Sequence, residues 1–356
     1  MNHQIGFIGL GKMGKNMVLR LLEQGVDVVV YNRTREVTEE FESEYRATSI
    51  GYRETSDYKS DTRSSSLETQ NSCKLFPAYD LQDLIKQLSP PRIIWLMVPS
   101  SANPPAGEAG ATAGKPNASP IDEVLQQLTS FGIQKGDIVI DGGNTYYKDT
   151  VRRAKALADR GIVYLDCGTS GGLDGARHGA CLMIGGAEAQ VQKLEWLWNA
   201  LSQQGDPLQD HALRGWEYFG PTGAGHFVKM VHNGVEYGMN EAIGEGFEIL
   251  SKSPYRLDFA KVAHAWSHGS VVRGWLVELL AEALDKDPSL ARYSGRVGGG
   301  ETGKWAIEAA KEGGVSAPVI EDALKAREKS LQKPTFAGKV VSALRAGYGG
   351  HKEPGK

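Results

Sequence analysis

The chain has 356 residues, with 40 lysines and arginines against 43 aspartates and glutamates and a formal net charge of -3. This length allows two domains, since single hydrophobic cores stop growing at roughly 250 to 300 residues. The charge balance offers no basic excess for a phosphate backbone, and no apolar run approaches the roughly 20 residues of a membrane span. We therefore expect a cytoplasmic protein that has neither nucleic acid nor a membrane as its partner.

The three cysteines are Cys73, Cys167 and Cys181. Their number is odd and no pair has the C-x-x-C spacing, so the sequence predicts free thiols and neither a disulfide framework nor a zinc site. We expect no metal and no leader segment before the first strand.

The first predicted elements are a strand over 4–8, a glycine turn over 9–14 that reads G-L-G-K-M-G, a helix over 15–24 and a second strand over 26–31. In such a turn Gly9 makes the tight bend, Gly11 lets a pyrophosphate approach the backbone, and Gly14 allows the helix to pack closely. This order predicts a dinucleotide-binding βαβ unit, and a coincidental glycine-rich turn is the alternative.

The end of the second strand reads Tyr31-Asn32-Arg33-Thr34. An acidic residue here would bind the ribose 2′-hydroxyl of NAD, whereas an arginine can pair with the 2′-phosphate of NADP. We therefore expect NADP, with NAD less favoured. The alternative is that Arg33 is a solvated surface residue.

Three further strands are predicted over 92–98, 137–141 and 161–167, with helices over 121–131 and 150–160 between them. Alternating strands and helices predict an α/β domain with a Rossmann-like, doubly wound sheet. Ligands bind at the carboxyl ends of such strands, which places Asn144 and the loop 169–172 near the substrate or the nicotinamide. Asn144 could equally be a turn residue.

Two stretches interrupt this alternation. Residues 54–72 are rich in serine, threonine and charge, and residues 100–120 are rich in alanine, proline and glycine. Neither can bury much apolar area, so we interpret both as surface insertions.

A long helix is predicted from residue 223 to about residue 252. Its polar residues share one face because they stand at positions i, i+3, i+4, i+7 and i+11: Lys229, His232, Asn233, Glu236 and Asn240. This mixture of chemistries, interrupted by Gly234 and Gly238, is unlike an ordinary solvated face. It predicts a functional face, and the glycines indicate that another backbone or a ligand comes close.

Lys229 can act as a general base only when it is neutral, so its pKa must be lowered from about 10.4. The nearby His232 and the positive end of the helix both favour this. Glu236 supplies a second proton carrier on the same face, which suits a reaction with a deprotonation and a later protonation.

These residues resemble those of 6-phosphogluconate dehydrogenase, the decarboxylating enzyme of the pentose phosphate pathway. The motifs that carry the resemblance are G-L-x-x-M-G at 9–14, N-R-T at 32–34, I-D-G-G-N at 140–144, S-G-G at 170–172 and G-A-G-H-F-V-K-M-V-H-N-G-x-E-Y-G at 223–238. The resemblance implies that 6-phosphogluconate, a phosphorylated sugar acid, is oxidised and decarboxylated to ribulose 5-phosphate and carbon dioxide. Lys229 would take the 3-hydroxyl proton, and Glu236 would protonate C1 of the enediol.

The resemblance also implies binding residues. Those expected to contact the cofactor are Gly9, Leu10, Gly11, Met13, Gly14, Asn32, Arg33, Thr34, Val98 and Asn144. Those expected to contact the substrate are Asn144, Ser170, Gly171, Gly172, His232, Asn233, Tyr237, Lys304, Arg327, Arg345 and His351. In the family the last two come from a second subunit, which implies a homodimer.

The implied organisation is an NADP-binding domain over 1–210, a helical substrate and dimerisation domain over 211–333, and a C-terminal tail over 334–356 that reaches a partner. The second helical repeat of the full-length family is absent, so the chain resembles its shorter subclass. Ala306 stands where the family has a threonine, and Leu173 where it has a carboxylate.

Three alternatives compete with this interpretation. A 3-hydroxyisobutyrate dehydrogenase would share the glycine turn and the lysine but lacks the H-N-G-x-E-Y-G continuation. A non-catalytic NADP-binding sensor would be expected to lose Lys229. A nucleoside triphosphatase is rejected because Trp305 replaces the hydroxyl of the phosphate loop in G-G-G-E-T-G-K-W.

Overall fold

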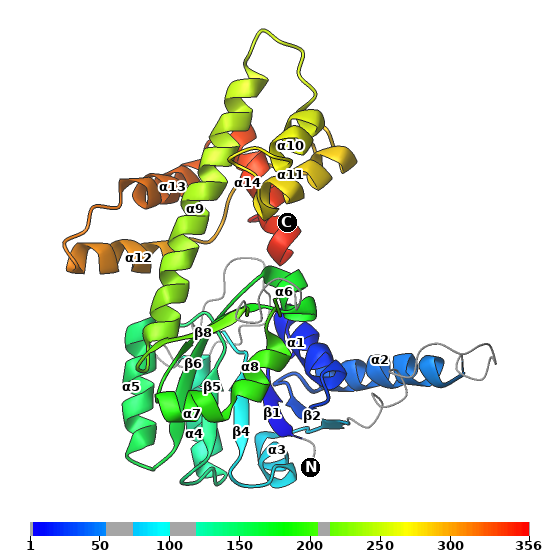
Figure 1. The fold of residues 1–356 in the computed structure, drawn as a ribbon, viewed down its shortest axis with the longest axis vertical. Coiled ribbons are helices and arrows are strands. Elements are labelled where there is room, and N and C mark those ends of the chain that lie inside the picture. The colour runs from blue at the N-terminus through cyan, green and yellow to red at the C-terminus, as the bar shows by residue number, and fades with distance from the viewer. Residues whose placement is uncertain (1–2, 55–73, 100–118, 206–213, 356) are drawn as a thin grey trace. The chain divides into compact units, whose positions relative to one another are not determined.

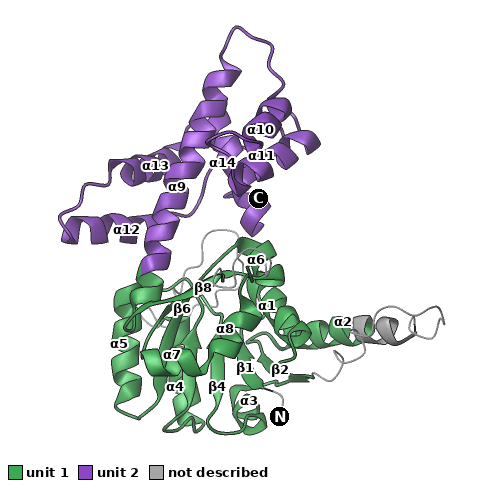
Figure 2. Ribbon diagram, viewed as in Figure 1, with its two compact units in different colours: residues 1–102, 115–227 green, residues 103–114, 228–356 purple. Residues whose placement is uncertain are grey.

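The computed structural model describes residues 3–54, 74–99, 119–205 and 214–355. These residues form two compact units, of which the first ends at Phe227 and the second begins at Val228 (Figure 2). The predicted insertions at 54–72 and 100–120 lie almost entirely outside the described residues.

Unit 1 is an eight-stranded sheet with helices on both faces (Figure 1). Its strands are β1 (Gln4–Ile8), β2 (Asp27–Tyr31), β3 (Leu75–Pro77), β4 (Ile93–Leu96), β5 (Ile138–Asp141), β6 (Val163–Ser170), β7 (Cys181–Gly185) and β8 (Trp216–Gly220). Its helices are α1 (Lys12–Glu23), α2 (Arg35–Glu54), α3 (Leu81–Gln87), α4 (Pro120–Ser130), α5 (Tyr147–Ala158), α6 (Gly172–His178), α7 (Glu188–Lys193) and α8 (Glu195–Leu201).

The strands lie in the order β3-β2-β1-β4-β5-β6-β7-β8. All neighbours pair parallel except β6 and β7, which pair antiparallel. Side chains alternate between the two faces of a strand, so Ile5 and Phe7 of β1 join one hydrophobic core and Ile8 joins the other. The predicted doubly wound α/β class is confirmed.

Both edges of the sheet, β3 at one side and β7 and β8 at the other, differ from the sequence-based expectation. Strands β3, β7 and β8 were not predicted, and β8 pairs with β7 beyond the expected domain boundary at residue 210. Strand β6 also continues to Ser170, because Ser170 pairs with Cys181 of β7. These strands are defined by their pairing partners, which local periodicity does not reveal.

Unit 2 is entirely helical among its described residues. Its helices are α9 (Ala224–Ser251), which begins within unit 1, α10 (Phe259–Ser267), α11 (Trp275–Lys286), α12 (Glu301–Glu312), α13 (Pro318–Ser330) and α14 (Phe336–Gly349). The expectation of an all-α C-terminal domain is confirmed. No helix in the described ranges is both long enough and apolar enough to cross a membrane.

Helix α14 accounts for most of the segment that was predicted to be a tail. It packs against α11 of the same chain, and Val340 and Leu344 join Phe247 and Leu280 in the core of unit 2. In the single chain this segment is therefore part of unit 2, and its contribution to a partner stays a prediction.

Candidate active site

The glycine turn after β1 has the geometry that its sequence predicts. Gly9 has a φ of 105°, and a Cβ there would collide with the carbonyl oxygen of Met97. A Cβ on Gly14 would collide with the carbonyl oxygen of Gly9, whereas a Cβ on Gly11 would meet no atom within 4 Å. The turn itself thus requires Gly9 and Gly14, while Gly11 leaves open space beside the backbone at the start of α1, as phosphate binding needs.

Asn32 holds the end of β2 against this turn. Its Oδ1 accepts a hydrogen bond from the backbone N–H of Leu10 at 3.1 Å, and its Nδ2 donates to the carbonyl of Thr34 at 3.1 Å. Arg33 and Thr34 are exposed. Asn32 therefore shapes the loop from which Arg33 extends. This structural role was not predicted from the sequence.

A second arginine near this loop was missed by sequence reasoning. The guanidinium of Arg35 lies 4.5 Å from the ring centre of Tyr79 and donates to Glu39 at 2.8 Å. Tyr79 follows β3, so the stack joins two βα turns that the sequence alone could not bring together. Asp80, the next residue, is a helix cap that accepts from the N–H of Asp83 at 2.7 Å.

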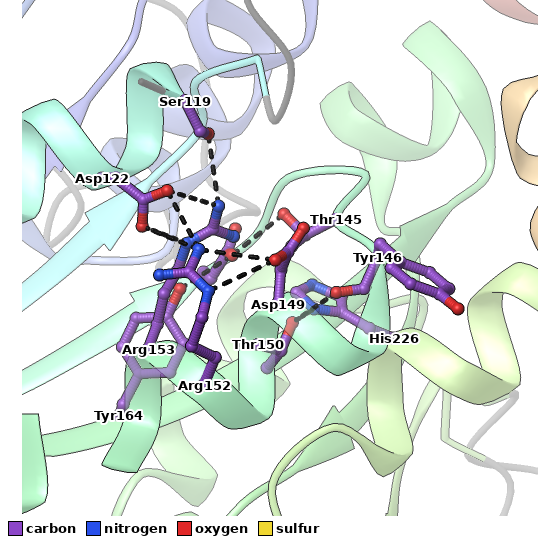
Figure 3. A network of polar contacts seen from close by, with 11 residues as sticks. Ser119, Asp122, Thr145, Tyr146, Asp149, Thr150, Arg152, Arg153, Tyr164 and His226 are labelled. Atoms are coloured by element: carbon purple, nitrogen blue, oxygen red, sulfur yellow. Dashed lines mark hydrogen bonds and ion pairs between the residues drawn. The ribbon is translucent and has the colours of Figure 1, made fainter. Parts of the chain in front are cut away.

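Asn144 is exposed between two anchored neighbours. Buried Asp141, at the end of β5, accepts hydrogen bonds from Gly143 N at 3.1 Å and from Thr145 Oγ1 at 3.0 Å. The hydroxyl of Tyr164 also donates to Asp141, at 2.8 Å. Figure 3 shows Thr145 and Tyr164, two of these hydrogen-bond donors. Asp141 thereby fixes the loop that presents Asn144 at the carboxyl edge of the sheet.

A second buried carboxylate, Asp166, fixes the start of α9. Its two oxygens accept from the backbone N–H groups of Gly223 at 2.7 Å and His226 at 2.9 Å. This arrangement satisfies two of the unpaired N–H groups at the helix N-terminus. His226 Nδ1 lies 2.7 Å from Thr150 Oγ1 (Figure 3), so the first turn of α9 is also tied to α5. The sequence analysis did not identify Asp166.

The S-G-G motif lies at the junction of β6 and α6. Ser170 is the last residue of β6, Gly171 has a φ of 113° at the N-cap of α6, and Gly172 is its first residue. A Cβ on Gly171 would stand 2.9 Å from Gly175 Cα. The predicted loop 169–172 is thus a tight strand-to-helix turn. Leu173, which stands where the family has a carboxylate, lies in the first turn of α6.

The predicted polar face of α9 is present. Lys229 Nζ lies 3.5 Å from His232 Nδ1, and that nitrogen lies 3.1 Å from Asn233 Oδ1. Asn240 Nδ2 donates to Glu236 Oε1 at 3.1 Å. Burial, and then the charge of Lys229, lower the pKa of His232. A neutral imidazole beside Lys229 can share a hydrogen bond with the amine without adding a second positive charge.

The glycines of α9 allow close contacts, as predicted, but the neighbours are side chains of unit 2. A Cβ on Gly234 would stand 3.2 Å from the Cβ of Ala306 in α12 and 3.1 Å from Ile320 in α13, and a Cβ on Gly238 would stand 3.0 Å from Val319. Ala306 is buried at this contact. Close helix packing therefore accounts for both glycines.

Two arginines, Arg327 and Arg345, lie close to Tyr237 of α9. The guanidinium carbon of Arg327 is 3.4 Å from the ring centre of Tyr237, and Arg327 is 3% exposed. Its buried Nη2 has no hydrogen-bond partner among the described residues. Burial, and then the charge of Arg327, lower the pKa of Arg345. A buried and a half-buried guanidinium group with an unsatisfied donor between them form a site suited to an anion.

The glycine-rich segment before α12 lies against these residues. A Cβ on Gly299 would stand 3.3 Å from Arg345 Nη2, and a Cβ on Gly303 would stand 2.6 Å from the Tyr237 ring. Lys304 has a 54% exposed side chain and lies 3.8 Å from Glu328. The structure thus brings Tyr237, Arg327 and Arg345 together, while Lys304 extends from the exposed side of α12.

His351 lies at the end of α14, with its ring centre 6.0 Å from that of Tyr348. The Tyr348 hydroxyl donates to Glu236 Oε1 at 2.6 Å. The predicted acid Glu236 therefore belongs to a cluster that includes a residue of α14 that sequence reasoning did not single out. The only feature of the sequence that could have pointed to Tyr348 is its position three residues before His351.

Comparison with known proteins identifies the family. A sequence profile described as the NAD binding domain of 6-phosphogluconate dehydrogenase matches residues 4–106 and 115–208, and one described as its C-terminal domain matches residues 225–343. The chain belongs to the 6-phosphogluconate dehydrogenase family. The matched profiles are those of 6-phosphogluconate dehydrogenase in both halves of the chain.

Individual relatives agree with this assignment. The chain is 35% identical to the NAD(+)-dependent, decarboxylating 6-phosphogluconate dehydrogenase of Haloferax volcanii, and the match covers 98% of each chain. It is 34% identical to the NADP(+)-dependent enzyme of Bacillus subtilis, over 93% of this chain and 62% of that one. The solved 6-phosphogluconate dehydrogenase of Plasmodium falciparum matches with a TM-score of 0.72 and 29% identity, over 93% of this chain and 62% of that one. Because the relatives use both coenzymes, family membership sets a nicotinamide cofactor but not its type.

Proposed function

We propose that this protein oxidises and decarboxylates 6-phosphogluconate to ribulose 5-phosphate and carbon dioxide with reduction of NADP. The observation that supports this most strongly is the juxtaposition within unit 2 of two features. One is the polar face of α9 with Lys229 and Glu236, and the other is buried Arg327, which has an unsatisfied donor, together with half-buried Arg345. A phosphorylated sugar acid needs both, since it carries an anionic group for binding and a hydroxyl group for oxidation.

In this mechanism Lys229 removes the proton of the 3-hydroxyl as C3 is oxidised, and a nicotinamide held by the glycine turn would supply the hydride acceptor. The resulting β-keto acid loses its carboxylate as carbon dioxide while the protonated Lys229 gives its proton to the ketone oxygen, which leaves the enediol and a neutral amine. Glu236 then protonates C1 of the enediol, and Lys229 recovers the proton of the enediol hydroxyl. At the end of the cycle Lys229 has gained a proton and Glu236 has lost one, and proton exchange with water restores both groups.

We assign the binding roles to the residues that the family resemblance implies. Tyr237, Arg327 and Arg345 would hold the substrate phosphate, with Lys304 and His351 at the margin of that site. His232, Asn233, Asn144 and the Ser170-Gly171-Gly172 turn would hold the hydroxyls and carboxylate. The glycine turn, with Leu10, Met13, the Asn32-Arg33-Thr34 loop and Val98, would hold the cofactor.

The proposal of NADP as the coenzyme is supported by the exposed Arg33 and by the Arg35 stack beside it. We expect Arg33→Ala to reduce the ratio of kcat/KM for NADP over NAD by about tenfold or more, because a charge-assisted hydrogen bond contributes roughly 1.5 to 3 kcal/mol. Initial-rate measurements with each coenzyme would give this ratio. An unchanged ratio would contradict the role of Arg33, and Arg46→Ala on exposed α2 serves as the control.

A homodimer is also proposed. Val231, Val235 and Met239 are 39%, 50% and 52% exposed along one side of α9, and Val315 and Val319 add exposed apolar area in the same unit. Exposed apolar side chains repeated along one side of a helix are typical of an interface.

The decisive experiment is an assay of the purified chain with 6-phosphogluconate and NADP that follows NADPH absorbance and carbon dioxide release together. We expect both products in equal amounts. NADPH without carbon dioxide would contradict the decarboxylation. If neither NADP nor NAD supported any activity, the result would favour the non-catalytic sensor.

A further inference from the structure

The proposed acid Glu236 has an asymmetric set of hydrogen bonds. Its Oε1 accepts from the Tyr348 hydroxyl at 2.6 Å and from Asn240 Nδ2 at 3.1 Å. Asn240 Nδ2 also lies 3.3 Å from the Tyr348 oxygen, so the three side chains form a closed triangle. No hydrogen bond to Glu236 Oε2 is made by the residues that the structure describes. One carboxyl oxygen is thus fixed, and the other is available for a proton.

Tyr348 is itself held in place. Its ring lies 6.4 Å from that of Trp275 at the start of α11 and 6.0 Å from that of His351. Burial, and then the charge of Glu236, raise the pKa of the Tyr348 phenol, which therefore stays protonated and serves as a donor. Asn240 is fully buried within α9, so the second donor is also fixed.

We propose that Tyr348 is a positioning residue for the protonation step, because its hydroxyl holds Glu236 Oε1 and so directs Oε2 toward the carbon that receives the proton. This rests on the proposed function. A carboxylic acid transfers its proton efficiently only from a defined position, and two donors on one oxygen restrict both its rotamer and the site of its proton.

The step that Tyr348 supports begins with the enediol left after carbon dioxide departs. The electron pair of the enediol double bond forms the new C–H bond at C1 with the proton of Glu236 Oε2. The enediol hydroxyl gives its proton to Lys229 and becomes the ketone, while Glu236 is left as a carboxylate. Tyr348 exchanges no proton in this step and only keeps its hydrogen bond.

The test is Tyr348→Phe in the full-length chain, which removes one oxygen and keeps the ring between Trp275 and His351. We expect the pre-steady-state burst of NADPH to keep its wild-type rate, because hydride transfer precedes protonation. Steady-state kcat should fall about tenfold, as expected for loss of one hydrogen bond to a charged group. The solvent deuterium isotope effect on kcat should rise, since proton transfer to C1 becomes rate-limiting.

The product formed in D2O gives a second measurement that does not depend on rate. Wild-type enzyme should place deuterium in one stereochemical position at C1, whereas Tyr348→Phe should give a mixture if solvent competes with a misplaced Glu236. Tyr293→Phe removes a hydroxyl from another half-buried tyrosine of unit 2 and is the matched control.

An unchanged isotope effect and an unchanged product stereochemistry would overturn the proposal. A slower NADPH burst would also overturn it, because Tyr348 would then act on substrate binding or hydride transfer. Failure of the proposed function is distinct, since the wild-type chain would itself form no NADPH and no carbon dioxide from 6-phosphogluconate.

Discussion

Replacing Lys229 by methionine should lower kcat with 6-phosphogluconate by about 10³-fold, within the roughly 10² to 10⁴-fold range of general acid–base catalysis. Methionine keeps the length and apolar stem of lysine but has no amine. Lys229 takes part in oxidation, in decarboxylation and in the final proton transfer, so its loss affects each step. Lys229 is half-buried, with its Nζ 3.5 Å from His232 Nδ1.

Steady-state kinetics with Lys229→Met would measure this loss, and calorimetry would show whether NADP and 6-phosphogluconate still bind. Lys252→Met, at an exposed position just beyond the end of α9, provides the matched control and should leave kcat unchanged. A kcat within about threefold of wild type for Lys229→Met would refute the assignment of the base, since one charge-assisted contact alone exceeds that effect.

Replacing Arg327 by methionine should raise KM for 6-phosphogluconate about 10- to 100-fold, with a smaller effect on kcat. Arg327 is buried on the Tyr237 ring and has an unsatisfied Nη2, so a phosphate would complete its hydrogen bonds. Loss of a charge-assisted hydrogen bond costs roughly 1.5 to 3 kcal/mol, which corresponds to this range of KM. The methionine stem keeps much of the packing against Tyr237.

Comparison of 6-phosphogluconate with gluconate makes this test specific for the phosphate. In Arg327→Met, the ratio of kcat/KM for 6-phosphogluconate to kcat/KM for gluconate should fall strongly. A general packing defect would instead lower both values together. Arg296→Met, on the exposed surface before the glycine-rich segment, is the control. A preserved preference for the phosphorylated substrate would exclude Arg327 from phosphate binding.

Local patterns predicted those parts of the fold that depend on contacts close in sequence. The strand over 4–8 and the helices near α1, α4 and α5 were recognised because apolar residues recur with the period of the element. Strands β3, β7 and β8 were missed because they are defined by pairing with other strands, which local periodicity does not reveal. The first unit consequently extends beyond the expected boundary at residue 210.

The candidate site divides in the same way. Lys229, His232, Asn233, Glu236 and Asn240 were placed on one face from their spacing, and the structure confirms that arrangement. No role was predicted for Asp141 or Asp166, which hold the Asn144 loop and the start of α9, because the partners of a buried aspartate are decided by the tertiary structure. The Arg35 stack on Tyr79 was likewise invisible, since its partners lie on different turns.

The sequence by itself determined the dinucleotide-binding turn, the two-part architecture and the polar face of α9, because glycine conformation and helical periodicity are properties of neighbouring residues. Only the tertiary structure decided that Arg327 lies buried on Tyr237 beside Arg345, and that Tyr348 holds Glu236. These contacts join α9 to α13 and α14, and their geometry follows from helix packing that no local pattern specifies.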